Sequence, residues 1–262
     1  GFQYDKGMQG AFDPKWKLWY DGTRPVRQWL YERKPSHMVV IYNDHMNYFD
    51  LKAYPTFAIG MAEHFPQADE GYGLRPFPGV DGDPDFAWPV ARALSRDGFD
   101  LTFCQELELD HGVYSWLPYL LDAPWPVKIL PIAVNMLMQP VPTPQRLCAL
   151  GASLRNAILN DCASHDVVVL ATGGMSHQIH GTRFGLTNEK FDRYFLATIE
   201  KGLDELLATP MEEIMQIAGT EAGELSMWYT MRKALSPAAT THYSYYTLPA
   251  VTGCGVIALD ER

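Results

Sequence analysis

Short apolar runs alternate along this chain with longer segments of helical periodicity. The runs lie at residues 38–42, 101–103, 127–132, 167–170 and 255–259. The helical segments, whose apolar residues are three and four positions apart, lie at 84–98, 143–160, 188–202 and 221–235. Strands that are apolar at every position are typical of sheets covered on both faces. The alternation therefore predicts an α/β fold, with a central mixed, largely parallel sheet flanked by helices.

Nothing in the sequence divides it into separate domains. It contains no internal repeat and no Pro/Gly/Ser-rich linker, and 262 residues can bury one large core. The Gly- and Pro-rich stretch 69–83 predicts a long surface loop. The many aromatic side chains between 16 and 29 indicate that the N-terminal region packs on the body or on a partner. We therefore expect residues 1–262 to form a single domain.

The charge balance excludes several classes of partner. The chain has 21 Lys and Arg against 31 Asp and Glu, and its net charge of −10 repels a phosphate backbone. No apolar run has the length of a membrane-spanning helix. The 4 cysteines are scattered without a CxxC pair, which indicates reduced thiols. The sequence thus predicts a cytoplasmic protein that binds neither nucleic acid nor a membrane.

Three predicted strands are followed by turns that contain histidine. His45 follows the first run, His111 the second and His177 the fourth. A single histidine in such a position is more often structural, but ligands of open α/β sheets bind outside the carboxyl ends of the strands. We therefore expect the three to converge on one crevice. His180 can line its mouth, and the remaining histidines, interpreted as structural or solvated, are His37, His64, His165 and His242.

Two carboxylates, Glu221 and Glu224, begin the last predicted helix. Acidic side chains are favourable at the positive end of a helix dipole, and from the residues alone this explanation is the stronger. The alternative is a metal ligand, because two histidines and one carboxylate leave open positions on a non-haem Fe(II). The spacing does not decide between them, since the ligands come from different elements.

The pair Gly173-Gly174 follows the fourth run. It predicts a turn that needs positive φ. A phosphate-binding loop is the alternative, but the lysine of the GxxxxGK[ST] motif is missing. We therefore discount nucleotide binding.

Several motifs, in order along nearly the whole chain, resemble the class III extradiol dioxygenases. They lie at 42–45, 55–60, 68–71, 110–112, 172–178 and 221–224. The resemblance implies cleavage of a carboxylated catechol such as protocatechuate or gallate by O2, with Fe(II) as cofactor and a hydroxymuconate-type product. It is less specific to one substrate than to the family.

The resemblance also implies roles for residues at matching positions. His45 and Glu224 match ligands of the iron, His177 matches an acid/base histidine, and His111 matches a histidine beside the active site. The extradiol family therefore places all four side chains at one reaction centre.

Three further residues are expected near the substrate or the ligands. Asn43 and Asp44 flank His45 and would orient it or its water. Thr252 lies where the family contacts the substrate carboxylate, and it resembles the gallate enzymes more than the protocatechuate enzymes. A threonine at a strand edge is also common without any role, so both readings of Thr252 stay open.

One family motif is missing. The family's other histidine ligand lies in a Ser-His-x-Pro motif after a first strand, and this sequence contains no such motif. We expect that about 15 residues, a strand and its turn, are missing before Gly1. Because a site with two ligands binds Fe(II) weakly, a catalytically inactive small-molecule-binding relative is the alternative function. Zinc-dependent hydrolysis, which uses similar ligands, fits the order of motifs less well.

The resemblance suggests partners as well. Protocatechuate enzymes of the family add a small helical α subunit, whereas gallate enzymes fuse an equivalent domain to the C-terminus. This chain ends just past its last predicted strand, so three expectations stay open: a separate α subunit, a homo-oligomer, or a truncation at the C-terminus. The aromatic N-terminal region and the segment 136–138 are candidate contact surfaces, although core packing is the stronger explanation of both.

Overall fold

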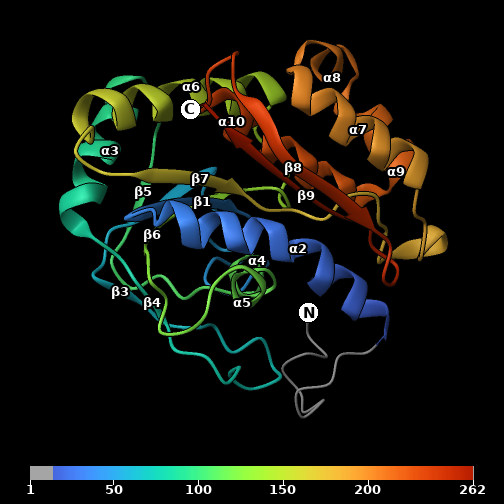
Figure 1. Cartoon of the computed structure of the whole chain (residues 1–262), viewed down its shortest axis with the longest axis horizontal. Helices are drawn as coiled ribbons and strands as arrows, with labels where there is room; N and C mark the ends of the chain where they lie inside the picture. Colours follow the sequence, from blue (N-terminus) through green and yellow to red (C-terminus); the bar gives the residue numbers. More distant parts are fainter. Residues whose placement is uncertain (1–13, 262) are drawn as a thin grey trace.

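A five-stranded sheet forms the centre of the computed structural model, which describes residues 14–261 (Figure 1). The order is β5-β2-β6-β1-β7. The strands are β1 (His37–Tyr42), β2 (Phe57–Gly60), β5 (Thr102–Cys104), β6 (Lys128–Val134) and β7 (Val167–Ala171). β1 is parallel to β6 and β7, and β2 is parallel to β5 but antiparallel to β6. The predicted mixed, largely parallel sheet is confirmed.

Helices cover both faces of this sheet (Figure 1). On one face lie α3 (Pro84–Arg96), α6 (Pro144–Asp161) and α10 (Met227–Lys233). On the other lie α2 (Pro14–Arg33), α4 (His111–Tyr114) and α5 (Leu117–Leu120). Strand β1 is buried along its whole length, and Val39 and Ile41 pack toward α3 and α6. Met38, Val40 and Tyr42 pack toward the opposite helices, which explains why every position of this run is apolar.

The last strand departs from the prediction. Instead of joining the central sheet, β9 (Cys254–Asp260) pairs antiparallel with β8 (Thr240–Thr247) in a separate hairpin. β8 mixes polar and aromatic residues and is mostly exposed, so no apolar run revealed it. Packed against this hairpin is α7 (Glu189–Lys201), followed by α8 (Asp204–Ala208) and α9 (Met211–Ala218).

The long loop predicted over 69–83 is irregular except for its end, where β4 (Val80–Asp81) pairs with β3 (His64–Phe65). The aromatic N-terminal region packs on the body, because the rings of Trp29 and His242 stack with centroids 5.9 Å apart. The four cysteines are free, as predicted. Across residues 14–261, no helix combines the length and the apolar character that crossing a bilayer requires.

A cavity of about 1340 Å³ extends between β7 and β9. Among the described residues, β7 pairs only with β1 and β9 only with β8, and all five β7 residues are only partly buried. The guanidinium of Arg33 lies 3.0 Å from Asp166, just before β7, and 3.5 Å from Asp260, at the end of β9. The two strands therefore run in opposite directions along the cavity, with α2 and α10 contributing to its walls.

Candidate active site

His45 lies in the turn after β1, between two carboxylates. Its Nδ1 is 2.8 Å from Oδ2 of Asp110, and its Nε2 is 3.3 Å from Oε1 of Glu224. Asp110 is fully buried and also accepts the backbone N–H groups of His45 and Gly112, each at 2.8 Å. Because a carboxylate at Nδ1 fixes the tautomer and direction of an imidazole ring, Asp110 directs Nε2 toward Glu224.

Electrostatics favour a cation between these two side chains. Burial lowers the pKa of His45, but its hydrogen bonds to Asp110 and Glu224, together with their charges, raise this pKa to about 10. Burial raises the pKa of Glu224, but the hydrogen bond and charge of His45 outweigh it and hold this pKa below its usual range. The site therefore stabilises positive charge at the position where Nε2 and Oε1 meet.

Glu224 does not lie in the first turn of an α-helix, so the predicted helix over 221–235 is wrong at its start. The segment Thr220–Ser226 is a 3₁₀ helix, η2, and α10 begins only at Met227. Three residues per turn put Glu221 and Glu224 on one side of η2. Glu221 contacts His180 at 3.0 Å, whereas Glu224 reaches His45. A helix dipole therefore does not explain the position of Glu224.

The glycine pair after β7 lets the backbone approach the side chains of Glu224 and His177 closely. Gly173 has φ +118°, as its sequence predicted, and a Cβ there would lie 2.8 Å from Cβ of Glu224. A Cβ on Gly174 would lie 2.7 Å from Cε1 of His177. The backbone N–H of Gly174 donates to Oε2 of Glu224 at 3.0 Å. Side chains at these two positions would therefore push the end of β7 away from both residues.

His177 is buried beside the glycine pair. Its Nδ1 lies 2.8 Å from the carbonyl oxygen of Met175. Because a carbonyl only accepts hydrogen bonds, Nδ1 carries the proton and Nε2 has a free lone pair. Thr252 pairs with His177 in an antiparallel bridge and lines the same cavity. The structure thus brings His177 and Thr252 together.

The loop that carries His177 is held by Asp192 on α7. This buried carboxylate accepts three hydrogen bonds. Ser176 donates its backbone N–H at 2.8 Å and its side-chain hydroxyl at 2.6 Å, and Tyr246 donates its hydroxyl at 2.8 Å. Sequence reasoning missed Asp192, since an acidic residue in the first turn of a helix is already explained by the helix dipole. It is a positioning residue for the loop.

His111 lies against His45, with ring centroids 3.9 Å apart. Its Nδ1 is hydrogen-bonded to Glu70, which also forms an ion pair with Arg75 at 2.8 Å. Burial raises the pKa of Glu70, but the contacts with His111 and Arg75 outweigh it and lower this pKa. Neither Glu70 nor Asp110 was singled out from the sequence, although both lie within the family motifs at 68–71 and 110–112. Their place in these motifs was the sequence feature that could have identified them.

Asn43 and Asp44 precede His45 and are both buried. Oδ1 of Asn43 accepts the backbone N–H of Met136 at 3.3 Å, and its Nδ2 has no hydrogen-bond partner within the described part of the chain. The carboxylate of Asp44 accepts the backbone N–H groups of residues 47–49 at 3.1 to 3.2 Å. Asp44 therefore shapes the turn that carries His45, while the Asn43 side chain lines the cavity.

Comparison with known proteins identifies the class. A family model described as the catalytic LigB subunit of aromatic ring-opening dioxygenase matches residues 6–256, so the chain belongs to this family of extradiol-type enzymes.

Individual relatives agree with this assignment. The chain is 36% identical over 197 residues to gallate dioxygenase of Pseudomonas putida KT2440, covering 74% of this chain and 58% of that protein. It is 31% identical over 154 residues to 2,3-dihydroxyphenylpropionate/2,3-dihydroxicinnamic acid 1,2-dioxygenase of Rhodococcus jostii RHA1, covering 58% of this chain and 46% of that protein. The matches thus span about half the length of these two relatives.

A solved structure shares the fold. The crystal structure of the uncharacterized protein JW3007 from Escherichia coli K12 superimposes with a TM-score of 0.51. The alignment covers 90% of this chain and 91% of that chain at 14% identity, so the similarity concerns the fold alone.

Proposed function

We propose that this protein cleaves the ring of a carboxylated catechol, such as protocatechuate or gallate, by extradiol dioxygenation with Fe(II). The observation that carries the proposal is the 3.3 Å separation of His45 Nε2 and Glu224 Oε1 at the wall of the cavity that His177 also lines. Two ligands about 2.0 to 2.2 Å from one metal ion lie at such a separation. Both relatives are dioxygenases of dihydroxylated or trihydroxylated aromatic acids by name, which supports the reaction class.

His45 and Glu224 fit Fe(II) as an imidazole and a carboxylate, but a facial set needs one more histidine. We assign this third ligand to a further strand that lies between β7 and β9. With this strand added, residues 1–262 form the catalytic domain. The half-exposed β7, the cavity beside it and the opposite directions of β7 and β9 support such a strand. If it runs parallel to β7, its carboxyl end emerges beside Gly173, next to His45.

The position of α2 supports the place of this strand in the polypeptide. α2 ends at Arg33, beside the start of β7, and therefore begins toward the opposite end of the sheet. A strand that precedes α2 and lies parallel to β1 would use α2 as the crossover of a βαβ unit.

The mechanism assigns proton transfer to His177. Bound Fe(II) would supply Lewis acidity for the catechol hydroxyls and a binding position for O2. His177 accepts a hydroxyl proton at Nε2 and returns it later in the cycle, while the carbonyl of Met175 keeps Nδ1 protonated. Thr252, next to His177, donates a hydrogen bond to the substrate carboxylate. His111, beside His45, offers a second polar group to the substrate hydroxyls.

Oxygen uptake and iron analysis test this proposal. A protein that carries the upstream segment is expected to hold one iron per chain and to consume O2 with protocatechuate or gallate, whereas residues 1–262 alone bind iron weakly. Hydrogen exchange provides a second readout, since the upstream strand should protect β7 and β9 amides. Stoichiometric iron and tight anaerobic binding of both acids without any O2 uptake would instead establish the inactive small-molecule-binding relative.

We also propose a cytoplasmic location and an assembled state. The four free cysteines support the cytoplasm. The assembled state is either a complex with a small helical α subunit or a homo-oligomer, and the exposed Leu18 and Leu137 are supporting surface residues. Light scattering after size-exclusion chromatography tests this, and a monomer that stays active alone would contradict it.

A further inference from the structure

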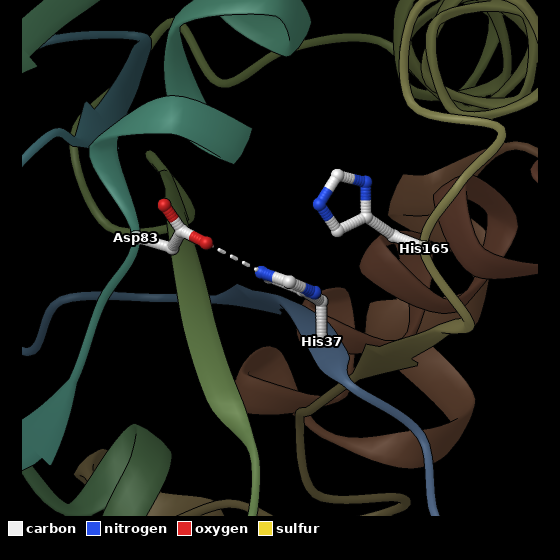
Figure 2. Close-up of side chains that lie close together, drawn as sticks. All are labelled: His37, Asp83 and His165. Carbon is white, nitrogen blue, oxygen red and sulfur yellow. Dashed lines mark hydrogen bonds and ion pairs between the residues drawn. The ribbon is translucent and has the colours of Figure 1, made fainter.

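A second group of histidine and aspartate side chains lies at the opposite end of the sheet from His45 (Figure 2). His37 is the first residue of β1, Asp83 caps the N-terminus of α3, and His165 lies just before β7. One ligand atom from each of these three residues lies within 4.8 Å of the others. Three separate elements therefore present their donor atoms to one point.

His37 presents one ring nitrogen to a carboxylate. Its Nδ1 lies 2.9 Å from Oγ of Ser36, and its Nε2 lies 2.9 Å from Oδ2 of Asp83. In the tautomer that binds a metal through Nε2, Nδ1 donates its proton to Oγ of Ser36, and this hydroxyl donates to the carbonyl of Asp166 at 3.1 Å. A cation can therefore take the place of the proton between Nε2 and Asp83.

The other two side chains are held as metal ligands usually are. Oδ1 of Asp83 accepts the backbone N–H groups of Asp85 and Phe86 at 2.9 and 3.3 Å, which leaves Oδ2 for a cation. Nδ1 of His165 lies 3.3 Å from the carbonyl oxygen of Cys162, so this nitrogen carries its proton. Figure 2 shows the other ring nitrogen of His165 turned toward Asp83 and His37. Such outer hydrogen bonds fix the tautomer and direction of ligands.

We propose that His37, Asp83 and His165 bind a zinc-class divalent cation, with water as the fourth ligand. Two imidazoles and one carboxylate are typical zinc donors, whereas magnesium and calcium prefer oxygen atoms throughout. Asp83 and His165 are partly exposed, so solvent reaches the fourth position. The cation joins the beginnings of β1, α3 and β7. It lies roughly 17 Å from His45, the length of a six-residue strand, and is independent of the proposed iron site.

Zinc alone is the probe for this site. Titration is performed in a His45→Ala background, which weakens binding at the other end of the sheet. This variant is expected to retain one zinc per chain after dialysis and to unfold at a higher temperature with zinc than without it. Adding His165→Ala is expected to remove both the bound zinc and the rise in unfolding temperature that zinc causes. Adding His64→Ala instead is the matched control, because His64 is hydrogen-bonded to the carboxylate of Asp81, at 3.1 Å, and lies outside the three-residue group.

Two results would overturn the proposal: no zinc in the His45→Ala protein, or unchanged zinc content after His165→Ala is added. If circular dichroism shows that His165→Ala unfolds the chain, Asp83→Asn replaces it. Asparagine keeps the N-cap hydrogen bonds of α3 but removes the negative charge. We expect it to weaken zinc binding by about 10- to 100-fold, and an unchanged affinity would again refute the site.

Discussion

The two ends of the central sheet both gather histidine and carboxylate side chains, but they differ in their surroundings. At the carboxyl end, His45 and Glu224 line a large cavity beside a glycine pair that lets the backbone approach closely. At the amino end, the ring of His37 is stacked on Phe86, with centroids 4.3 Å apart. The proposed substrate site therefore differs from the proposed ion site in the open space beside its ligands, because of the three residues at the amino end only His165 lines the cavity.

The largest expected effect concerns His45. His45→Ala removes one proposed iron ligand and the partner of Glu224, so we expect loss of both stoichiometric iron and measurable O2 uptake. His64→Ala, an exposed histidine remote from the cavity, is the control and should retain both. Iron content and O2 consumption measure the difference. Equal activity in the two variants would contradict the proposal that the carboxyl end of the sheet holds the reaction centre.

Replacing His177 by Phe separates chemistry from metal binding. Phenylalanine keeps much of the ring volume but cannot accept a proton, so we expect kcat to fall by about 10² to 10⁴. Iron content should stay near that of the unchanged protein, because His177 is not one of the proposed ligands. Turnover that survives the substitution would contradict the acid/base role.

Asp110→Asn tests how strongly the carboxyl end depends on ligand orientation. The amide retains an acceptor for His45 and for the N-terminus of α4, but it loses the charge that favours a cation at the ring. We expect iron affinity to fall by about 10- to 100-fold. Competition with a chelator measures this, with the exposed Asp81→Asn as the matched control. The same affinity in both variants would show that Asp110 acts only as a helix cap.

The smallest expected effect is on stability. Because the pKa of Glu70 lies below its ordinary value of 4.5, its contacts with His111 and Arg75 stabilise the fold above that pH and are lost as the pH falls through the lowered pKa. Glu70→Gln should therefore lower the free energy of unfolding by about 1 to 3 kcal/mol at neutral pH. This loss should become smaller as the pH falls. Urea unfolding at several pH values measures this, and a pH-independent difference would argue against a charged contact.

Much of the fold was predictable because the central strands are covered on both faces. The runs that became β1, β6 and β7 are apolar at nearly every position, and the helices between them begin at caps such as Asp83 and Thr143. Strand β2 was missed because two of its four residues are alanine and glycine, which are depleted in strands. The pairing of β9 was wrong because its partner, β8, is half-exposed and carries no apolar run.

The site was predictable where topology alone brings residues together. His45, His111 and His177 follow different strands, and the structure places all three along one cavity, as the rule for carboxyl ends of strands predicts. Asp192 could not be found in this way, because it acts through a loop from a helix outside the sheet. The contact of Glu224 with His45 depends on a 3₁₀ turn that the apolar spacing did not reveal.

The sequence separation of His45 and Glu224, 179 residues, also has a consequence for biosynthesis. Chains emerge from the ribosome N-terminus first, so His45 and Asp110 are available long before η2 has been made. Glu224 joins them only through a contact of very high sequence separation, and such contacts form late in folding. Metal insertion is therefore expected to follow translation, and nascent chains that stop short of η2 would be released without a centre able to retain iron.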